Sequence, residues 1–90
     1  MNATEIYDLI PNNGRKSFYG KAKVIIIGSC HYLRSYDTIM GWIDHKDGSI
    51  HRCSDYKSYT TCAHVKSFTC GKVDFWSLPL EKKPTLKVIL

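Results

Sequence analysis

The chain has 90 residues, of which 43% are hydrophobic and 23% are charged, which is the composition of one small folded domain and not of a disordered segment. This length excludes barrel enzymes and doubly wound nucleotide-binding folds, which need roughly 200 residues or more. Thirteen lysines and arginines against eight acidic residues give a net charge of +5, which favours an acidic partner such as nucleic acid, a membrane surface or an acidic protein face.

The first residues do not resemble a secretory signal, because they carry neither a positive charge nor a long apolar run. The apolar run 24–27 is too short for a bilayer span, which needs about 20 residues. We therefore expect a cytoplasmic protein without a membrane partner, whose thiols stay reduced. Its four cysteines are then buried apolar residues or metal ligands before they are disulfides: Cys30, Cys53, Cys62 and Cys70.

The first predicted element is a short amino-terminal helix over residues 2–10. Asn2 is a good helix-capping residue. Three apolar residues follow it at helical spacing, namely Ile6, Leu9 and Ile10. The Pro-Asn-Asn-Gly run 11–14 ends the helix and forms a turn.

Four strands are predicted next, as an antiparallel meander. The strongest covers residues 17–27, and two lysines indicate that one of its faces starts in solvent. Asp47 and Gly48 form the clearest hairpin signal, because this pair tolerates the positive φ angles of a tight turn. The other three strands are predicted over residues 30–36, 39–44 and 49–53.

The periodicity becomes helical after these strands. The main helix is predicted at about residues 59–70, with Ser58 as its cap and Gly71 at its end. Residues 73–80 form either a final strand or a packed extended segment. The sequence therefore predicts a single α+β domain over residues 1–80, with a four- to five-stranded antiparallel sheet packed by one main helix. Residues 81–90 are then a tail that is either disordered or an edge strand.

Two pairs of histidine and cysteine are weak candidates for metal ligands. His51 and Cys53 would share a face of a strand, whereas Cys62 and His64 would lie about 200° apart on a helix. One tetrahedral site fits this arrangement poorly, so we expect no metal and no cofactor. A second interpretation places His51 and His64 across the junction of sheet and helix, as the base and acid of a small ribonuclease. We expect a protein that is not an enzyme and keep this activity as a third possibility.

Aromatic and basic residues alternate along two neighbouring predicted strands. If these strands pair, their side chains can line one face, and stacked rings with flanking cations are how sheets hold single-stranded nucleic acid. A plain solvated face is the simpler explanation. The candidate binding residues are Tyr19, Lys21, Lys23, Tyr32, Arg34, Tyr36 and, as a further basic residue, Arg52.

A motif at the start of the main helix also has a structural interpretation. Ser58 caps the helix, Thr61 satisfies an amide of the first turn or packs, and His64 bridges the helix to a strand near His51 or Arg52. Apolar contacts then anchor the helix to the sheet. The whole motif consists of Tyr56, Ser58, Thr60, Thr61, His64, Val65 and Phe68.

This motif, together with segments 17–22, 33–38 and 47–52, resembles a family of short proteins found in phages and other mobile elements of Gram-positive bacteria. The resemblance covers about residues 17–68. The family tends to carry an arginine before the helix histidine, where this chain has Ala63. The resemblance implies a genetic context and no particular chemistry.

We therefore expect a small phage- or mobile-element-encoded binding protein that inhibits or modulates a host factor, with a bacterial immune effector as the first candidate, in the manner of an anti-CRISPR protein. The expected partner is a host protein or ribonucleoprotein. The alternative is a nucleic-acid-binding regulator that uses the basic and aromatic sheet face. The protein is expected to be a monomer or a homodimer.

Overall fold

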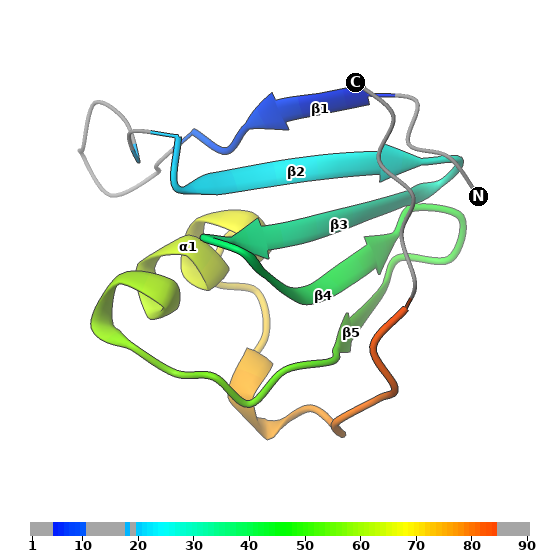
Figure 1. The fold of residues 1–90 in the computed structure, drawn as a ribbon. Helices are drawn as coiled ribbons and strands as arrows, with labels where there is room; N and C mark the ends of the chain where they lie inside the picture. Colours follow the sequence, from blue (N-terminus) through cyan, green and yellow to red (C-terminus); the bar gives the residue numbers. More distant parts are fainter. Residues whose placement is uncertain (1–4, 11–17, 19, 85–90) are drawn as a thin grey trace.

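An antiparallel sheet organises the chain, as Figure 1 shows for the computed structural model, which describes residues 5–10, 18 and 20–84. In this part of the chain each strand pairs with the next one in sequence. The α+β fold with one main helix is confirmed. The elements are β1 (Glu5–Asp8), β2 (Ala22–Ile27), β3 (Cys30–Ser35), β4 (Thr38–Asp44), β5 (Ser49–Arg52), the helix α1 (Tyr59–Thr69) and the 3-10 turn η1 (Phe75–Ser77).

The hydrophobic core lies between one face of the sheet and α1. The apolar stripe of the helix supplies Val65 and Phe68, as the sequence predicts, and η1 adds Phe75. Burying such side chains is the main favourable term in folding. The strands contribute Val24, Leu33 and Met40.

The amino-terminal helix prediction is wrong, because residues 5–8 form strand β1 instead. Glu5 to Asp8 pair in register with β2, opposite Ile26 to Lys23. An isolated helix of so few residues is marginal in water, whereas a neighbouring strand offers a complete ladder of hydrogen bonds. Asn2, the predicted cap, lies outside the described residues.

Strand β2 begins at Ala22, later than the predicted strand 17–27. Gly20 has a φ of 76°, and the Lys21 N–H donates to the Phe18 carbonyl, so the chain turns before it becomes extended. Residues 17 and 19 lie outside the described part. Only glycine adopts this φ without steric cost, which makes Gly20 the residue that delays the strand.

The sheet carries one irregularity, between β3 and β4. Leu33 pairs with Gly41 and Arg34 pairs with Ile39, so Met40 is an extra residue on β4. The Met40 side chain is fully buried in the core. Such a bulge bends the strand and increases its twist, and here it also places a large side chain under the helix.

The second face of the sheet is not open to solvent throughout. Ile25 and Ile27 point to this face, opposite to Val24, and they are only 2% and 4% exposed. The face is therefore closed to solvent at these two residues, while Tyr32 and Trp42 on the central strands β3 and β4 are half-buried. None of the helices in residues 5–10, 18 and 20–84 combines the length and apolar character that crossing a bilayer requires.

Buried hydrogen bonds join α1 to β3. The Ser58 hydroxyl caps the helix by accepting from the Thr61 N–H at 3.1 Å, as predicted. Thr61 and His64 both reach Ser35, with 3.1 Å between the Thr61 and Ser35 hydroxyl oxygens and 2.8 Å between His64 Nδ1 and Ser35 Oγ. His64 is fully buried, with the Phe18 ring packed edge-on at 4.6 Å. The histidine thus bridges to β3 and not, as predicted, to the strand of His51 and Arg52.

Residues 73–80 form neither of the predicted elements completely. Phe75 is buried within η1, and Leu80 makes a single parallel bridge to Arg52 of β5. Glu81 then donates its N–H to the Arg52 carbonyl at 2.8 Å. Of the predicted tail, residues 81–84 are described and residues 85–90 lie outside the described part.

Gly41→Ala is expected to destabilise the fold, because an added Cβ would lie 2.0 Å from the His51 carbonyl oxygen and 3.0 Å from the Phe75 ring. Overpacking of this kind costs about 1–3 kcal/mol in free energy of unfolding. Urea unfolding followed by circular dichroism measures the loss. Gly48→Asn is the control, since Gly48 has open space and a φ of 76° that asparagine tolerates. Equal stability of Gly41→Ala and wild type would contradict the close approach.

Ser35→Ala is expected to lower the free energy of unfolding by about 1–3 kcal/mol, because it removes the hydroxyl that Thr61 and His64 share. These three residues form the buried joint between α1 and β3. The same urea experiment gives the value. Ser29→Ala serves as the matched control, because the Ser29 hydroxyl bonds to Asp44 at an exposed site and its loss should cost less than about 0.5 kcal/mol. Similar values for the two variants would argue against the joint.

Candidate functional site

A hollow of about 360 Å³ lies at the corner of the sheet where β2 begins and β3 ends. Four of the predicted binding residues meet there, although they come from two strands and two turns. The sequence analysis placed them on one face but did not predict a hollow. Its lining consists of Gly20, Lys21, Lys23, Arg34, Tyr36 and Asp37.

Pairing of β2 with β3 sets the geometry of this basic hollow. Lys23 lies directly opposite Arg34 in the register, so the two side chains leave the same face of the sheet. Like charges in this position are destabilising. The Tyr36 N–H donates to the Lys21 carbonyl at 2.7 Å, which brings the turn after β3 against the turn before β2.

Two carboxylates offset the cations of the basic hollow without burying them. Lys23 forms an ion pair with Asp8, and Arg34 forms one with Asp37 at 2.8 Å. The Asp37 side chain is 95% exposed, and exposed pairs of this kind contribute only about 0–1 kcal/mol. An incoming anion can therefore replace Asp8 or Asp37 at little cost.

Tyr36 holds an unusual backbone conformation at the edge of the basic hollow. Its φ is 56°, a left-handed value that a non-glycine residue adopts at a cost. The ring lies 5.7 Å from the buried His64 ring, and the Lys21 ammonium lies 5.5 Å from its centre. With 42% of the residue exposed, the hollow offers an aromatic surface next to a cation.

The remaining predicted binding residues lie elsewhere. Tyr32 is outside the basic hollow but on the same face of the sheet as Lys23 and Arg34. Arg52 is on the opposite face, where its Nε donates to the Leu78 carbonyl at 2.9 Å, so it fastens a loop. Tyr19 lies outside the described residues.

A row of aromatic rings crosses this face of the sheet, and the sequence analysis missed its central member, Trp42. Tyr32 lies 5.6 Å from Trp42, and Trp42 stacks on His51 at 4.9 Å with an interplanar angle of 14°. Burial, with Cys30 as a smaller cause, raises the pKa of Tyr32. The period-2 pattern places Trp42 on this face, but only the strand register shows that three rings adjoin.

The weak metal candidates do not converge. His64 is buried in the joint with Ser35, whereas His51 is on the other face of the sheet. The Cys53 thiol donates to the Ile39 carbonyl, and burial raises its pKa. Cys62 lines a separate hollow between α1 and η1. Among the described residues no group of three or more potential ligands forms. His51 and His64 also do not face each other, which removes the geometry of the ribonuclease interpretation.

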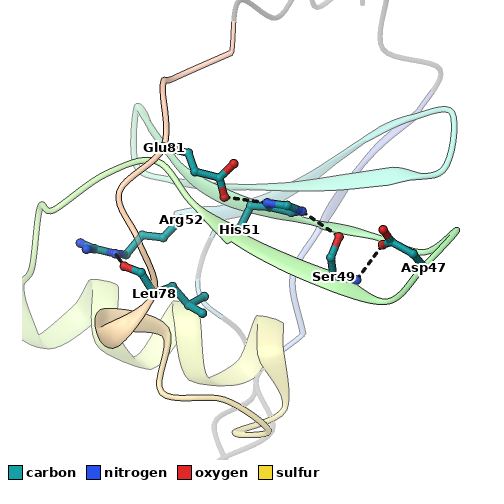
Figure 2. A network of polar contacts seen from close by, with 6 residues as sticks. All are labelled: Asp47, Ser49, His51, Arg52, Leu78 and Glu81. Atoms are coloured by element: carbon teal, nitrogen blue, oxygen red, sulfur yellow. Dashed lines mark hydrogen bonds and ion pairs between the residues drawn. The ribbon is translucent and has the colours of Figure 1, made fainter.

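A second polar cluster lies along β5 and its hairpin, as Figure 2 shows. The Ser49 hydroxyl lies 2.7 Å from His51 Nε2, and His51 Nδ1 lies 2.6 Å from the Glu81 carboxylate. At the hairpin, Asp47 accepts from the Ser49 N–H at 2.9 Å. Glu81 is 30 positions away from His51, so the sequence offers no signal for this contact.

A family model described as "Family of unknown function (DUF8033)" matches residues 7–76. This match covers most of the chain, so the protein belongs to that family. The matched region contains the whole basic hollow and the joint between α1 and β3, while Glu81 follows it. No protein of curated function and no solved structure matches the chain.

Hydrogen bonding by Ser49, whose backbone N–H donates to the carboxylate at 2.9 Å, lowers the pKa of the Asp47 carboxyl below its ordinary value of 3.8. Because the pKa is lower in the folded state than in the unfolded state, the ionised carboxylate stabilises the fold fully above pH 3.8. This contribution to stability is lost as the pH falls through the folded-state pKa. The stability difference between wild type and Asp47→Asn should therefore shrink in acid. Carbon-detected NMR titration should give an Asp47 pKa below 3.8, and a value at or above 3.8 would contradict the contact.

Proposed function

We propose that this DUF8033 member is a small binding protein, encoded by a phage or mobile element, that modulates a host factor in the host cytoplasm through its basic hollow. The observation that carries the proposal is the meeting of Lys21, Lys23, Arg34 and Tyr36 around one hollow. Their counter-ions are exposed and weakly held. The resemblance to mobile-element proteins supports the genetic context.

The chemistry of the hollow favours binding over catalysis. Lysine and arginine supply hydrogen-bond donors and positive charge, and Tyr36 supplies a flat ring for packing. Among the described residues that line it, Asp37 is the one acid, and it is held by Arg34. These described side chains recognise an anion and include no free base for proton transfer.

An acidic protein face is the preferred partner. The hollow has room for one or two side chains, and carboxylates at such positions can take the places of Asp8 and Asp37 beside the cations. A host protein, or the protein part of a ribonucleoprotein, is therefore the proposed target.

A nucleic-acid-binding regulator is the second candidate, and the aromatic row favours it. Tyr32, Trp42 and His51 are successive rings on the face that also carries Lys23 and Arg34. Stacking of bases on such rings contributes about 1–3 kcal/mol per base in single-strand binders. A steep loss of affinity with rising salt is the property that separates this candidate from the first.

The test is an affinity capture from host lysate with and without nuclease, followed by binding of the purified target. Wild type should enrich one host protein in both conditions. The double variant Lys21→Ala and Arg34→Ala should weaken binding of that protein at least about tenfold, or about 1.4 kcal/mol. The double variant Lys46→Ala and Lys72→Ala removes the same charge from exposed positions outside the hollow and should bind like wild type.

Two results would contradict this proposal. Equal weakening by both double variants would mean that net charge acts alone and that the hollow is not the binding surface. Recovery of nucleic acid only, lost on nuclease treatment or at high salt, would replace the protein partner by the second candidate.

A further inference from the structure

We propose that Ser49 is a nucleophilic serine, activated by His51 and Glu81, that accepts an acyl group from a small activated ester. The cluster lies apart from the basic hollow, on the hairpin side of the sheet (Figure 2). This activity goes beyond the proposed binding function and does not depend on it. Three side chains carry it through two short contacts, of 2.7 Å and 2.6 Å.

The order of the hydrogen bonds follows from the chemistry of the three groups. An ionised Glu81 only accepts, so a neutral His51 places its proton on Nδ1. His51 Nε2 then has a lone pair and accepts from the Ser49 hydroxyl. The serine is thus the donor to a base that a carboxylate orients, which is the arrangement that activates serine nucleophiles on unrelated folds.

The orientation of the histidine ring is held from a second direction. Trp42 stacks on His51 at 4.9 Å with the two rings nearly parallel. Glu81 is itself positioned because its N–H donates to the Arg52 carbonyl, next to the Leu80 bridge and the contact of Arg52 with the Leu78 carbonyl (Figure 2). Preorganisation of this kind is what lets a general base act without first being ordered.

The groups are accessible, unlike the second serine–histidine contact of the protein. The side chains of His51 and Glu81 are 28% and 40% exposed. Ser35 and His64 lie 2.8 Å apart but are 2% and 0% exposed, so that pair is a structural joint. Ser49 itself is half-buried, so a reagent in solution can approach Ser49 but not Ser35.

The peptide N–H of the residue after the serine points to the outer edge of β5. The Arg52 carbonyl points away from β4 toward Glu81, and backbone groups alternate in direction along a strand. The N–H of Ile50, two residues before Arg52 and one after Ser49, therefore points to the same outer edge. We assign this N–H to the oxygen that becomes negative during attack.

The reaction balances without a metal or a redox partner. Ser49 Oγ forms a bond to the ester carbonyl carbon while its proton moves to His51 Nε2. The carbon–oxygen bond to the leaving group then breaks, and the alcohol departs with that proton. Water, deprotonated by the same nitrogen, attacks the acyl group, releases the acid and returns the proton to Ser49. Because the cluster is open, we expect small activated esters and weak selectivity.

The experiment uses a fluorophosphonate probe on the full chain, with the labelled position read by peptide mass spectrometry. Its phosphorus bonds to a nucleophilic serine oxygen as fluoride leaves, and the proton again goes to the base. Wild type should be labelled at Ser49, and labelling should be lost in Ser49→Ala. His51→Ala and Glu81→Gln should each slow labelling at least about tenfold, within the range of general-base catalysis. Hydrolysis of p-nitrophenyl acetate should likewise be lost in Ser49→Ala and be slower in His51→Ala and Glu81→Gln than in wild type.

Ser77→Ala is the matched control, because the Ser77 hydroxyl donates to the Asp74 carbonyl at 2.8 Å, and this variant should leave labelling unchanged. Circular dichroism of each variant shows whether the fold is kept, and Glu81→Gln preserves the size of the side chain. Wild-type labelling no faster than that of Ser49→Ala would overturn the proposal and leave the cluster as a fastening of the carboxyl-terminal segment to β5.

Discussion

The hydrogen bond between Ser35 of β3 and His64 of α1 is the contact on which both the fold and the candidate site depend. Its two side chains are almost completely buried, and Thr61 shares the same serine hydroxyl. Polar groups in such a position are costly unless they are satisfied, so this joint specifies one placement of the helix on the sheet. Apolar packing by Val65 and Phe68 alone would tolerate a range of rotations and shifts.

The joint also connects the core to the surface. Tyr36 follows Ser35 directly, and its ring rests near His64 while its exposed side borders the basic hollow. The left-handed backbone of Tyr36 is therefore held between a buried anchor and the backbone contact to Lys21. A strained residue at this position links the placement of the helix to the shape of a surface that can bind an anion.

Local sequence signals predicted the elements whose causes are local. The Ser58 cap, the apolar stripe of α1 and the hairpin at Gly48 follow from neighbouring residues, and all three are present. The amino-terminal helix failed because pairing with β2, a contact far along the chain, outweighs the weak preference of a few residues for helix. The bulge at Met40 depends on the core that it fills and has no local signature.

The candidate site was predictable in composition but not in shape. Alternation placed Lys23 and Arg34 on paired strands, which the register of β2 and β3 bears out. Tyr36 and Lys21 reach the same corner through two turns, whose geometry depends on the left-handed φ of Gly20 and Tyr36. The contact of Glu81 with His51 closes a loop of about 30 residues, and no pattern within a strand or helix indicates such a closure.

The single parallel bridge from Leu80 to Arg52 has a further consequence for how the protein behaves at high concentration. A strand at the margin of a sheet presents unpaired peptide groups that recruit strands from other molecules, and this is a common start of aggregation. Here the chain lays its own Leu80 and Glu81 beside the end of β5. The segment blocks growth of the sheet at that point without forming a sixth strand, so the protein gains solubility from a contact that also orients His51.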